Sequence, residues 1–204
     1  DWVLFGSDGR EIERASLVVV AAALNSNAIG ACDLPLQPVR GQVSWNAMDS
    51  SNCAMPPFAM NGNGQFIAHV PISGEQAWFV GSTFDRDDTQ FDVRPADHSA
   101  NFERLQSLSP TNAARLEPEF AHNAVKAWTG IRCASSNRRP IVTEIHPGLW
   151  VSTAMGSRGL TYSKLCAELL AARLHAEPLP LQSRVAESLT PQASHDNGEA
   201  GSIP

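Results

Sequence analysis

The chain has 204 residues, of which 43% are hydrophobic and 18% are charged, so its length and composition fit one ordinary globular domain or two small ones. The longest apolar run, Leu17 to Leu24, is much shorter than the roughly 20 residues that a membrane span needs, and no signal-peptide pattern opens the sequence. The net charge of −6 argues against a general nucleic-acid binder, which would need an excess of Lys and Arg.

The cysteines are too widely spaced to form a recognisable zinc-binding motif. They stand at positions 32, 53, 133 and 166 without a C-x-x-C pair, and the histidines show no H-x-x-x-H pattern. Widely spaced thiols in a chain of this kind are typical of reduced cysteines in a cytoplasmic protein. We therefore predict no metal site and a cytoplasmic location.

The N-terminal part reads as β-structure. Trp2 to Phe5 predicts a short strand, a Gly-rich turn follows, and Glu11 to Ala23 predicts a second strand. The core of that second strand, Leu17 to Ala22, has no polar alternation, which favours a strand buried on both faces in a parallel sheet covered by helices. An α/β architecture is the expectation for this part.

The middle of the chain predicts a different kind of sheet. After a loop rich in Asn and Pro, three β-rich segments follow at Val39–Trp45, Gln65–Val70 and Ala77–Ser82, with Gly and Pro between them. Short alternating segments separated by turn residues indicate antiparallel strands. The whole chain is thus expected to combine an α/β part with an antiparallel sheet, in an α+β arrangement.

Helices are predicted on either side of further strands. The segment Asp97–Leu108 has apolar residues at helical spacing, with Asp97 as the expected N-cap and Pro110 as the expected stop. Val125–Cys133 and Leu149–Ala154 predict strands. A last helix is expected from about 161 to 174, and the polar stretch 194–204 is predicted to be disordered.

The turn Gly156-Ser157-Arg158-Gly159, just before this last helix, is the feature of the sequence that most suggests ligand binding. Glycines let a backbone approach a ligand closely, and the first turn of a helix presents unpaired N–H groups that suit an anion or an electron-rich oxygen. Arg158 would add a positive charge. A tight strand-to-helix connection without any ligand explains the same residues.

Several segments in fixed order resemble one enzyme family. Read in sequence, they resemble the FAD-dependent oxidoreductase domain of the bacterial bifunctional tRNA 5-methylaminomethyl-2-thiouridine biosynthesis proteins, in the superfamily of D-amino-acid-oxidase-type flavoenzymes. The resemblance covers roughly residues 1 to 191. The segments that carry it are LPLQPVRGQVS at 34–44, GSTFDRD at 81–87, DH at 97–98, NFERL at 101–105, GIRC at 130–133, PGLWV at 147–151, AMGSRGL at 154–160, AELLA at 167–171, EPLP at 177–180 and LTP at 189–191.

The resemblance implies a partial two-domain fold. Residues 1–38 and 131–187 are expected to belong to an FAD-binding domain, and residues 39–130 to a substrate-binding domain with an antiparallel sheet. Residues 188–204 are expected to form a polar, disordered tail. The G-x-G-x-x-G turn that holds the FAD pyrophosphate is absent, so we expect a C-terminal fragment that lacks the N-terminal Rossmann βαβ unit.

The resemblance also implies an activity. It is the FAD-dependent oxidative removal of a carboxymethyl group from carboxymethylaminomethyl-uridine at the wobble position of tRNA, in a parent protein that carries a methyltransferase domain in cis on the N-terminal side. A fragment of this kind is expected to be inactive by itself. Two alternatives stay open: a non-catalytic remnant or binding module, and a general glycine or D-amino-acid oxidase.

The resemblance assigns roles to particular residues. Arg132 is expected to pair with the substrate carboxylate, for which the guanidinium fork is well suited, with Arg40 and Gln42 as further substrate-binding residues. No catalytic acid or base is assigned. The cofactor-binding residues are expected to be Gly156, Ser157, Arg158, Gly159 and Leu160.

Overall fold

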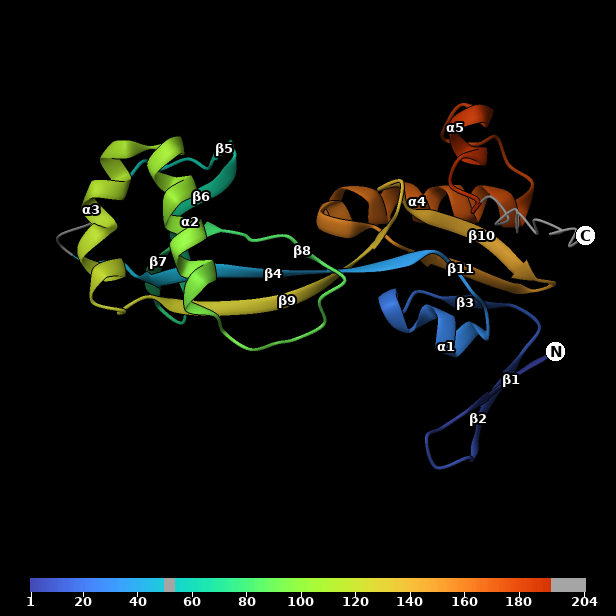
Figure 1. The fold of residues 1–204 in the computed structure, drawn as a ribbon. Helices are drawn as coiled ribbons and strands as arrows, with labels where there is room; N and C mark the ends of the chain where they lie inside the picture. The colour runs from blue at the N-terminus through green and yellow to red at the C-terminus, as the bar shows by residue number, and fades with distance from the viewer. Residues whose placement is uncertain (50–53, 192–204) are drawn as a thin grey trace, which may run out of the picture. The chain divides into compact units, whose positions relative to one another are not determined.

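The computed structural model describes residues 1–49 and 54–191 and divides into two compact units (Figure 1). Unit 1 comprises Asp1–Leu36 and the chain from Cys133 onward, and unit 2 comprises Gln37–Arg132. None of the helices in the described ranges combines the length and apolar character that a bilayer crossing requires.

Unit 1 contains a small mixed sheet with the order β10-β11-β3. Its strands are β3 (Val18–Val20), β10 (Ile141–His146) and β11 (Leu149–Thr153). β3 runs parallel to β11, whereas β10 and β11 form an antiparallel hairpin. The parallel pair agrees with the expected α/β character. β10 was not predicted, because its alternating residues are few and lie next to prolines.

Helices cover both faces of this sheet (Figure 1). The helices are α1 (Ser26–Gly30), α4 (Gly159–His175) and α5 (Ser183–Glu187), with a 3-10 turn at Ala23–Asn25. Val142 packs with Cys166 and Leu169 of α4, while the preceding Ile141 joins a second cluster with Val20 and Leu34. Neighbouring strand residues point to opposite faces, so this alternation places one hydrophobic core on each side.

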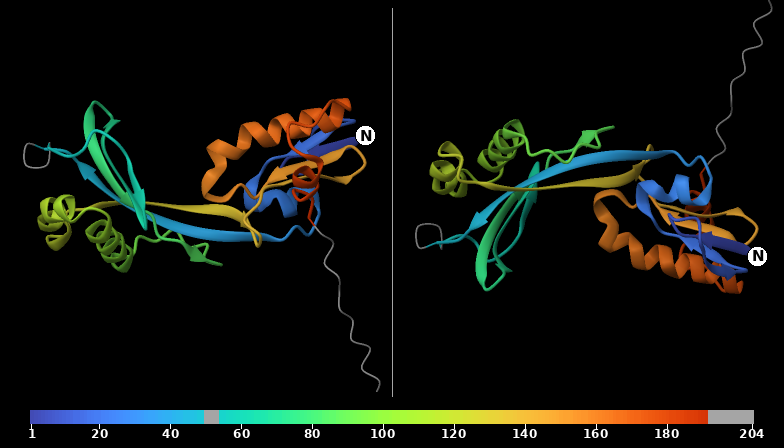
Figure 2. Two further views of the ribbon diagram at one scale, coloured as in Figure 1. Left: turned by 90° about the horizontal axis from the view of Figure 1, so that it is seen from above. Right: turned by 90° about the horizontal axis from the view of Figure 1, so that it is seen from below.

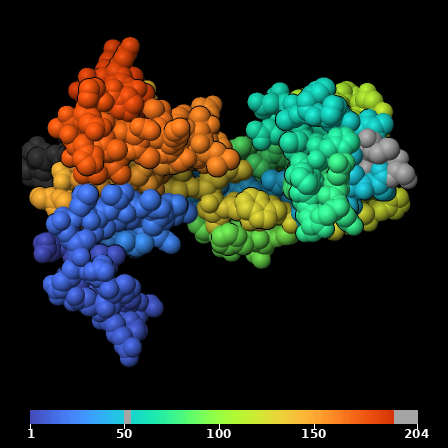
Figure 3. Space-filling view, turned by 180° about the vertical axis from the view of Figure 1, so that it is seen from behind, coloured from blue at the N-terminus to red at the C-terminus, as the bar shows by residue number. Residues whose placement is uncertain are grey.

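The N-terminal β-structure is more broken than predicted. β1 (Trp2–Phe5) pairs with β2 (Glu11–Ala15) in a separate hairpin, which stands out in Figure 3. The single strand predicted for Glu11–Ala23 is therefore wrong, and the segment predicted as a loop after it contains the end of the 3-10 turn and α1. The predicted burial of Leu17–Ala22 on both faces is also wrong, because Leu17 is 44% and Val19 41% exposed. Only Val18–Val20 form a strand, and it lies at an edge of the sheet formed by the described residues.

Unit 2 is built on a long antiparallel sheet, which confirms that prediction. The path β5-β6-β7-β4-β8 has β9 paired to β4 beside it (Figure 2). The strands are β4 (Leu36–Ala47), β5 (Met60–Gly62), β6 (Gly64–Ile72), β7 (Glu75–Gly81), β8 (Asp85–Arg86) and β9 (Lys126–Ser135).

Two helices, α2 (Pro95–Leu108) and α3 (Pro110–Ala121), pack on one face of this sheet. Phe66 and Trp78 of the sheet and Leu116 of α3 are fully buried in the core that they share. We expected Pro110 to end α2 and did not predict α3. α2 does end before it, but Pro110 also begins α3, because proline is well tolerated at the first helical position.

The expected N-cap of α2 is also wrong. The cap position is Arg94, followed by Pro95 at the first turn, and Asp97 lies inside the helix. The Asp97 carboxylate accepts a hydrogen bond from Arg40 at 2.6 Å instead of capping backbone N–H groups.

The chain stays ordered beyond residue 187. Leu189 is buried in the core beneath α4, and its carbonyl accepts a hydrogen bond from Val142 N–H at 2.9 Å. The expected start of a disordered tail at 188 is therefore wrong. The stretch 194–204 and Cys53 lie outside the described residues.

Candidate functional site

Arg40 lies on the helix-covered face of the unit 2 sheet and is fully buried. Its side chain makes five hydrogen bonds, as many as a guanidinium has N–H groups. Two of them are ion pairs with carboxylates. The acceptors are Asp85 Oδ2 at 3.2 Å, Asp97 Oδ2 at 2.6 Å, Gln42 Oε1 at 3.3 Å, Gln90 O at 2.9 Å and Asp92 O at 2.5 Å.

These bonds tie strand β4 to the chain that leads into α2. Gln42, also fully buried, donates from Nε2 to Arg94 O at 3.0 Å and accepts from Arg94 N–H at 2.8 Å. With every donor of Arg40 engaged, nothing remains for a substrate carboxylate. We therefore assign Arg40 and Gln42 to holding the 85–94 segment, in place of the direct substrate contact expected from the sequence.

Arg132 of β9 has a more open environment. Its Nη2 donates to Ser82 Oγ at 2.5 Å and its Nη1 to Thr83 O at 3.4 Å. The guanidinium lies over the Phe84 ring, 4.5 Å from the ring centre. Two of its five N–H groups thus have partners among the described residues. The rest of the fork is available to a carboxylate.

Gly41 makes room for this arrangement. A Cβ at Gly41 would fall inside van der Waals contact with the Arg132 guanidinium, so the side chain rests directly on the backbone of β4. Partial burial lowers the pKa of Arg132 from its ordinary value, because desolvation disfavours the charged form. The guanidinium of Arg132 still carries its charge at neutral pH. A desolvated cation attracts an added anion more strongly than a solvated cation does.

The residues that contact Arg132 were only partly predicted from the sequence. Ser82 and Phe84 belong to the GSTFDRD segment that carries the family resemblance, yet no role was assigned to them. Phe84 is 56% exposed and lies beside the Arg132 cation. Only the structure shows this arrangement. Glycine in the middle of a long strand, as at Gly41, is a signal for close approach of another group.

The turn at 156–160 in unit 1 follows β11 and opens α4. A 3-10 turn spans Gly156–Arg158, and Gly156 has a φ of +57°, which favours glycine. A Cβ added at Gly159 would meet no atom within 4 Å. Ser157 and Arg158 are exposed, and Leu160 is 97% exposed.

These features fit a flat cofactor ring such as that of FAD. An open glycine backbone permits close approach, the first turn of a 17-residue helix carries partial positive charge, and an uncovered leucine offers an apolar contact. Arg158 Nη1 donates to Tyr162 Oη at 3.5 Å, so its charge stays beside this helix start.

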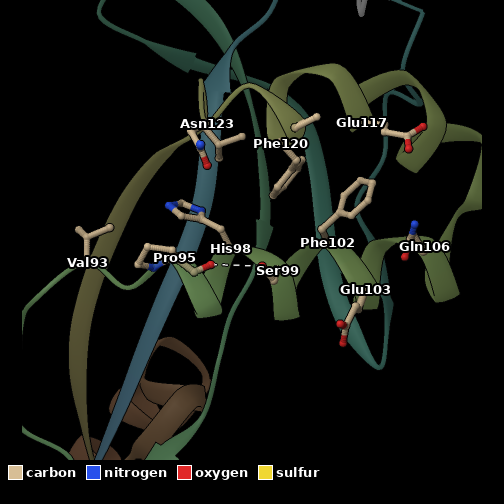
Figure 4. A pocket seen from close by; sticks show the side chains of 12 residues that line it. Val93, Pro95, His98, Ser99, Phe102, Glu103, Gln106, Glu117, Phe120 and Asn123 are labelled. Carbon is tan, nitrogen blue, oxygen red and sulfur yellow. Dashed lines mark hydrogen bonds between the residues drawn. The ribbon is translucent and has the colours of Figure 1, made fainter.

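A cavity of about 810 Å³ lies elsewhere in unit 2, among α2, α3 and the turn that leads into β9 (Figure 4). His98 is one of its lining residues, and the Nδ1 of His98 is 2.8 Å from Ser44 Oγ. Burial lowers the pKa of His98, and the neighbouring Asp97 carboxylate partly opposes this. None of the sequence-predicted site residues lines this cavity. Within 1–49 and 54–191, His, Cys, Asp and Glu form no cluster able to hold a metal ion.

The chain is similar to several known proteins. A family model described as FAD dependent oxidoreductase matches residues 2–173. The tRNA 5-methylaminomethyl-2-thiouridine biosynthesis bifunctional protein MnmC of Polaromonas sp. (strain JS666 / ATCC BAA-500) is 46% identical over 203 residues, which include 94% of this chain and 32% of that protein. The protein of the same description from Ralstonia nicotianae is 34% identical over 218 residues. The chain thus spans about a third of the length of these relatives.

Solved structures share the fold. Iminodiacetate oxidase from Chelativorans sp. BNC1 superposes with a TM-score of 0.66 at 22% identity, covering 93% of this chain and 49% of that one. Glycine oxidase from Geobacillus kaustophilus gives a TM-score of 0.65, with 92% and 48% covered. The chain thus shares its fold with about half of each of these two structures. Because the family model spans most of the sequence, the chain belongs to the family of FAD dependent oxidoreductases.

Proposed function

We propose that this chain is the C-terminal part of an enzyme that removes the carboxymethyl group from carboxymethylaminomethyl-uridine at the wobble position of tRNA. Three relatives at 41–46% identity are described as tRNA 5-methylaminomethyl-2-thiouridine biosynthesis bifunctional proteins, which supports a role in tRNA modification. In this proposal a methyltransferase domain in the same longer protein completes the modification, and the enzyme works in the cytoplasm, where tRNA is modified.

The observation that carries the proposal is the state of Arg132. It is partly desolvated, fixed by Ser82 and Phe84, and retains N–H groups without a partner among the described residues. We assign it to the substrate carboxylate, which it would bind through two parallel hydrogen bonds. This anchor holds the CH₂ between carboxylate and amine in one place, so orientation is supplied by the protein.

The net reaction releases the carboxymethyl group as glyoxylate, leaves an aminomethyl group on the uridine, consumes one water and needs a two-electron acceptor. FAD, when bound, supplies that acceptor. We assign Gly156, Ser157, Arg158, Gly159 and Leu160 to contact with the flavin. The backbone N–H groups and charge at the start of α4 favour the negative charge that gathers on a reduced ring.

We further propose that residues 1–204 alone do not hold FAD well. They contain no G-x-G-x-x-G turn, and the expected pyrophosphate cradle is therefore missing from this sequence. Expression of the chain with added FAD, followed by desalting and a visible spectrum, tests this point. A flavin content near equimolar with protein would contradict it.

Activity is best tested in a chimera. Residues 1–204 are joined to the preceding portion of the Polaromonas relative, in place of the segment that they match. The product is incubated with tRNA that carries carboxymethylaminomethyl-uridine. Mass spectrometry of the nucleosides then detects aminomethyl-uridine. Arg132→Ala should lower kcat/KM by roughly 30- to 150-fold, equivalent to about 2–3 kcal/mol for a lost charged hydrogen-bond pair.

The matched control is Arg10→Ala, which removes an exposed arginine in the turn between β1 and β2. Its kinetics should equal those of the parent chimera. Unchanged kinetics in Arg132→Ala would remove the carboxylate assignment. Oxidation of free glycine or D-amino acids, with no change in the tRNA, would favour a general amino-acid oxidase, and a chimera that binds FAD without any turnover would favour the non-catalytic alternative.

A further inference from the structure

The guanidinium of Arg132 is held by the successive residues 82–84. Ser82 contributes its hydroxyl, Thr83 its backbone carbonyl and Phe84 its ring. The contact to Ser82 Oγ is short, at 2.5 Å, whereas the contact to Thr83 O is 3.4 Å long. A ring face attracts a cation at any distance up to about 6 Å, but a hydrogen bond also requires direction. The Ser82 hydroxyl is therefore the contact that orients the guanidinium fork.

Ser82 is itself held firmly in place. It directly follows the last residue of β7 and is 7% exposed, and its carbonyl accepts a hydrogen bond from Arg104 Nη1 of α2 at 3.4 Å. The next residue, Thr83, is bonded twice to the backbone of Gln42. The Gln42 N–H donates to Thr83 Oγ1 at 3.0 Å, and the Thr83 N–H donates to Gln42 O at 3.2 Å. The backbone that carries the Ser82 hydroxyl is thus fixed at both residues.

Ser82 holds Arg132 without adding negative charge. Among the residues that the structure describes, no ion pair includes Arg132, whereas Arg40 and Arg94 are both paired with carboxylates. A carboxylate partner would compensate the charge of the guanidinium, and a substrate carboxylate would have to compete with it. A neutral hydroxyl orients the guanidinium and leaves its charge for an incoming anion.

A guanidinium that is already oriented binds a carboxylate at a lower entropic cost. A free arginine side chain samples many rotamers, and ordering it on binding opposes association. Arg132 rests against Gly41 and is bonded to Ser82, so it is ordered when the chain folds and not when the substrate binds. The CH₂ next to the bound carboxylate is then held in one place.

We infer that Ser82 is a positioning residue for the substrate carboxylate: its hydroxyl fixes the fork of Arg132, so that the remaining N–H groups meet the carboxylate in one orientation. This inference rests on the proposed function, in which Arg132 binds that carboxylate. Ser82 acts through Arg132 and needs no contact with the substrate. Its removal leaves the charge of Arg132 in place and changes where the CH₂ group lies.

The experiment uses the chimera described above and tRNA that carries carboxymethylaminomethyl-uridine. Ser82→Ala, Arg132→Ala and the double variant are compared with the parent chimera by steady-state kinetics. Because Ser82→Ala keeps the cation, kcat should fall about five- to tenfold while KM stays within about twofold. In the Arg132→Ala background the same substitution should have no further effect on kcat/KM, since Ser82 acts only through Arg132.

Ser109→Ala is the matched control. Ser109 is another buried serine of unit 2, 9% exposed, and its Oγ accepts a hydrogen bond from Asn112 Nδ2 at 2.8 Å. The control therefore removes a hydroxyl of similar burial that has a partner other than Arg132. Its kcat and KM should equal those of the parent chimera. The flavin content of every variant, from the visible spectrum after desalting, shows whether the chimera is folded.

Three results would overturn the inference: kinetics of Ser82→Ala equal to those of the parent, multiplication of the two losses in the double variant, or loss of flavin from Ser82→Ala but not from Arg132→Ala. The last result would make Ser82 a structural residue. Failure of the proposed function gives a different result. Unchanged kinetics in Arg132→Ala would remove the carboxylate role itself, whereas a defect in Arg132→Ala without one in Ser82→Ala would remove only the positioning role.

Discussion

Arg40 and Arg132 lie on opposite faces of the unit 2 sheet beside the same part of β4, and they differ in burial and in their hydrogen bonds. Arg40 is fully buried beneath the 85–94 segment, with five hydrogen bonds to protein acceptors. Arg132 lies on the opposite face, over Phe84, with two such bonds. A buried cation with all its donors engaged is structural, whereas a partly desolvated cation with donors to spare is fit to bind an anion.

The sequence does not show this difference, and both arginines were therefore expected to bind substrate. Arg40 and Gln42 belong to the same family-like segment, and an Arg-Gly-Gln sequence on a strand gives no indication of which face is covered. Strand alternation puts Arg40 and Gly41 on opposite sides. The position of α2 then decides that Arg40 is enclosed and that Gly41 supports Arg132.

The largest effect should come from removing Arg40. Arg40→Ala leaves Asp97 largely buried without its cation and should lower the free energy of unfolding by about 3–5 kcal/mol. Urea unfolding of the chain, followed by circular dichroism, measures the change. A loss below about 1 kcal/mol would show that the network is not the structural element we describe.

Removing Arg132 should change stability much less. Arg132→Ala gives up two hydrogen bonds, one of them long, and one cation–π contact, together about 1–2 kcal/mol in the same urea experiment. If this variant were as unstable as Arg40→Ala, the functional contrast between the two arginines would fail.

Gly41→Ala sharpens the comparison by moving Arg132 without deleting it. The new methyl group would meet the end of a flexible side chain, which can swing away, so the stability cost should stay within about 1 kcal/mol. In the chimera, kcat/KM should nevertheless fall at least about tenfold, because displacement of a positioning group is costly to catalysis. Activity equal to that of the parent chimera would show that the close contact between Arg132 and Gly41 is not needed for catalysis.

The smallest effect concerns His98 on the covered face. Burial lowers its pKa in the folded state, so the unfolded chain binds the proton more readily. The contribution of neutral His98 is present above the ordinary histidine pKa of about 6.5 and is lost as the pH falls through that value. The melting temperature of the wild type should therefore drop slightly more than that of His98→Gln between about pH 7.5 and about pH 5.5. Identical drops would exclude this coupling.

Local pattern accounts for much of the fold. The strands at 2–5, 126–135 and 149–153 and the helices at 95–108 and 159–175 lie close to their predicted positions, because each has a run of β-rich residues or apolar residues at helical spacing. α3 and β10 were missed because prolines begin or flank them. Asp97 was taken for a cap because its true partner, Arg40, is 57 residues away in sequence.

The sequence by itself determined the family of this chain, since short segments in a fixed order identify a fold even without its structure. It also determined that an antiparallel sheet follows an α/β segment, because hydrophobic alternation is a local property. The tertiary structure alone decided which arginine has donors to spare and which face of the sheet α2 and α3 cover. Burial and donor occupancy depend on contacts between residues far apart in sequence, such as Gly41 with Arg132 and Arg40 with Asp97. No local pattern encodes those contacts.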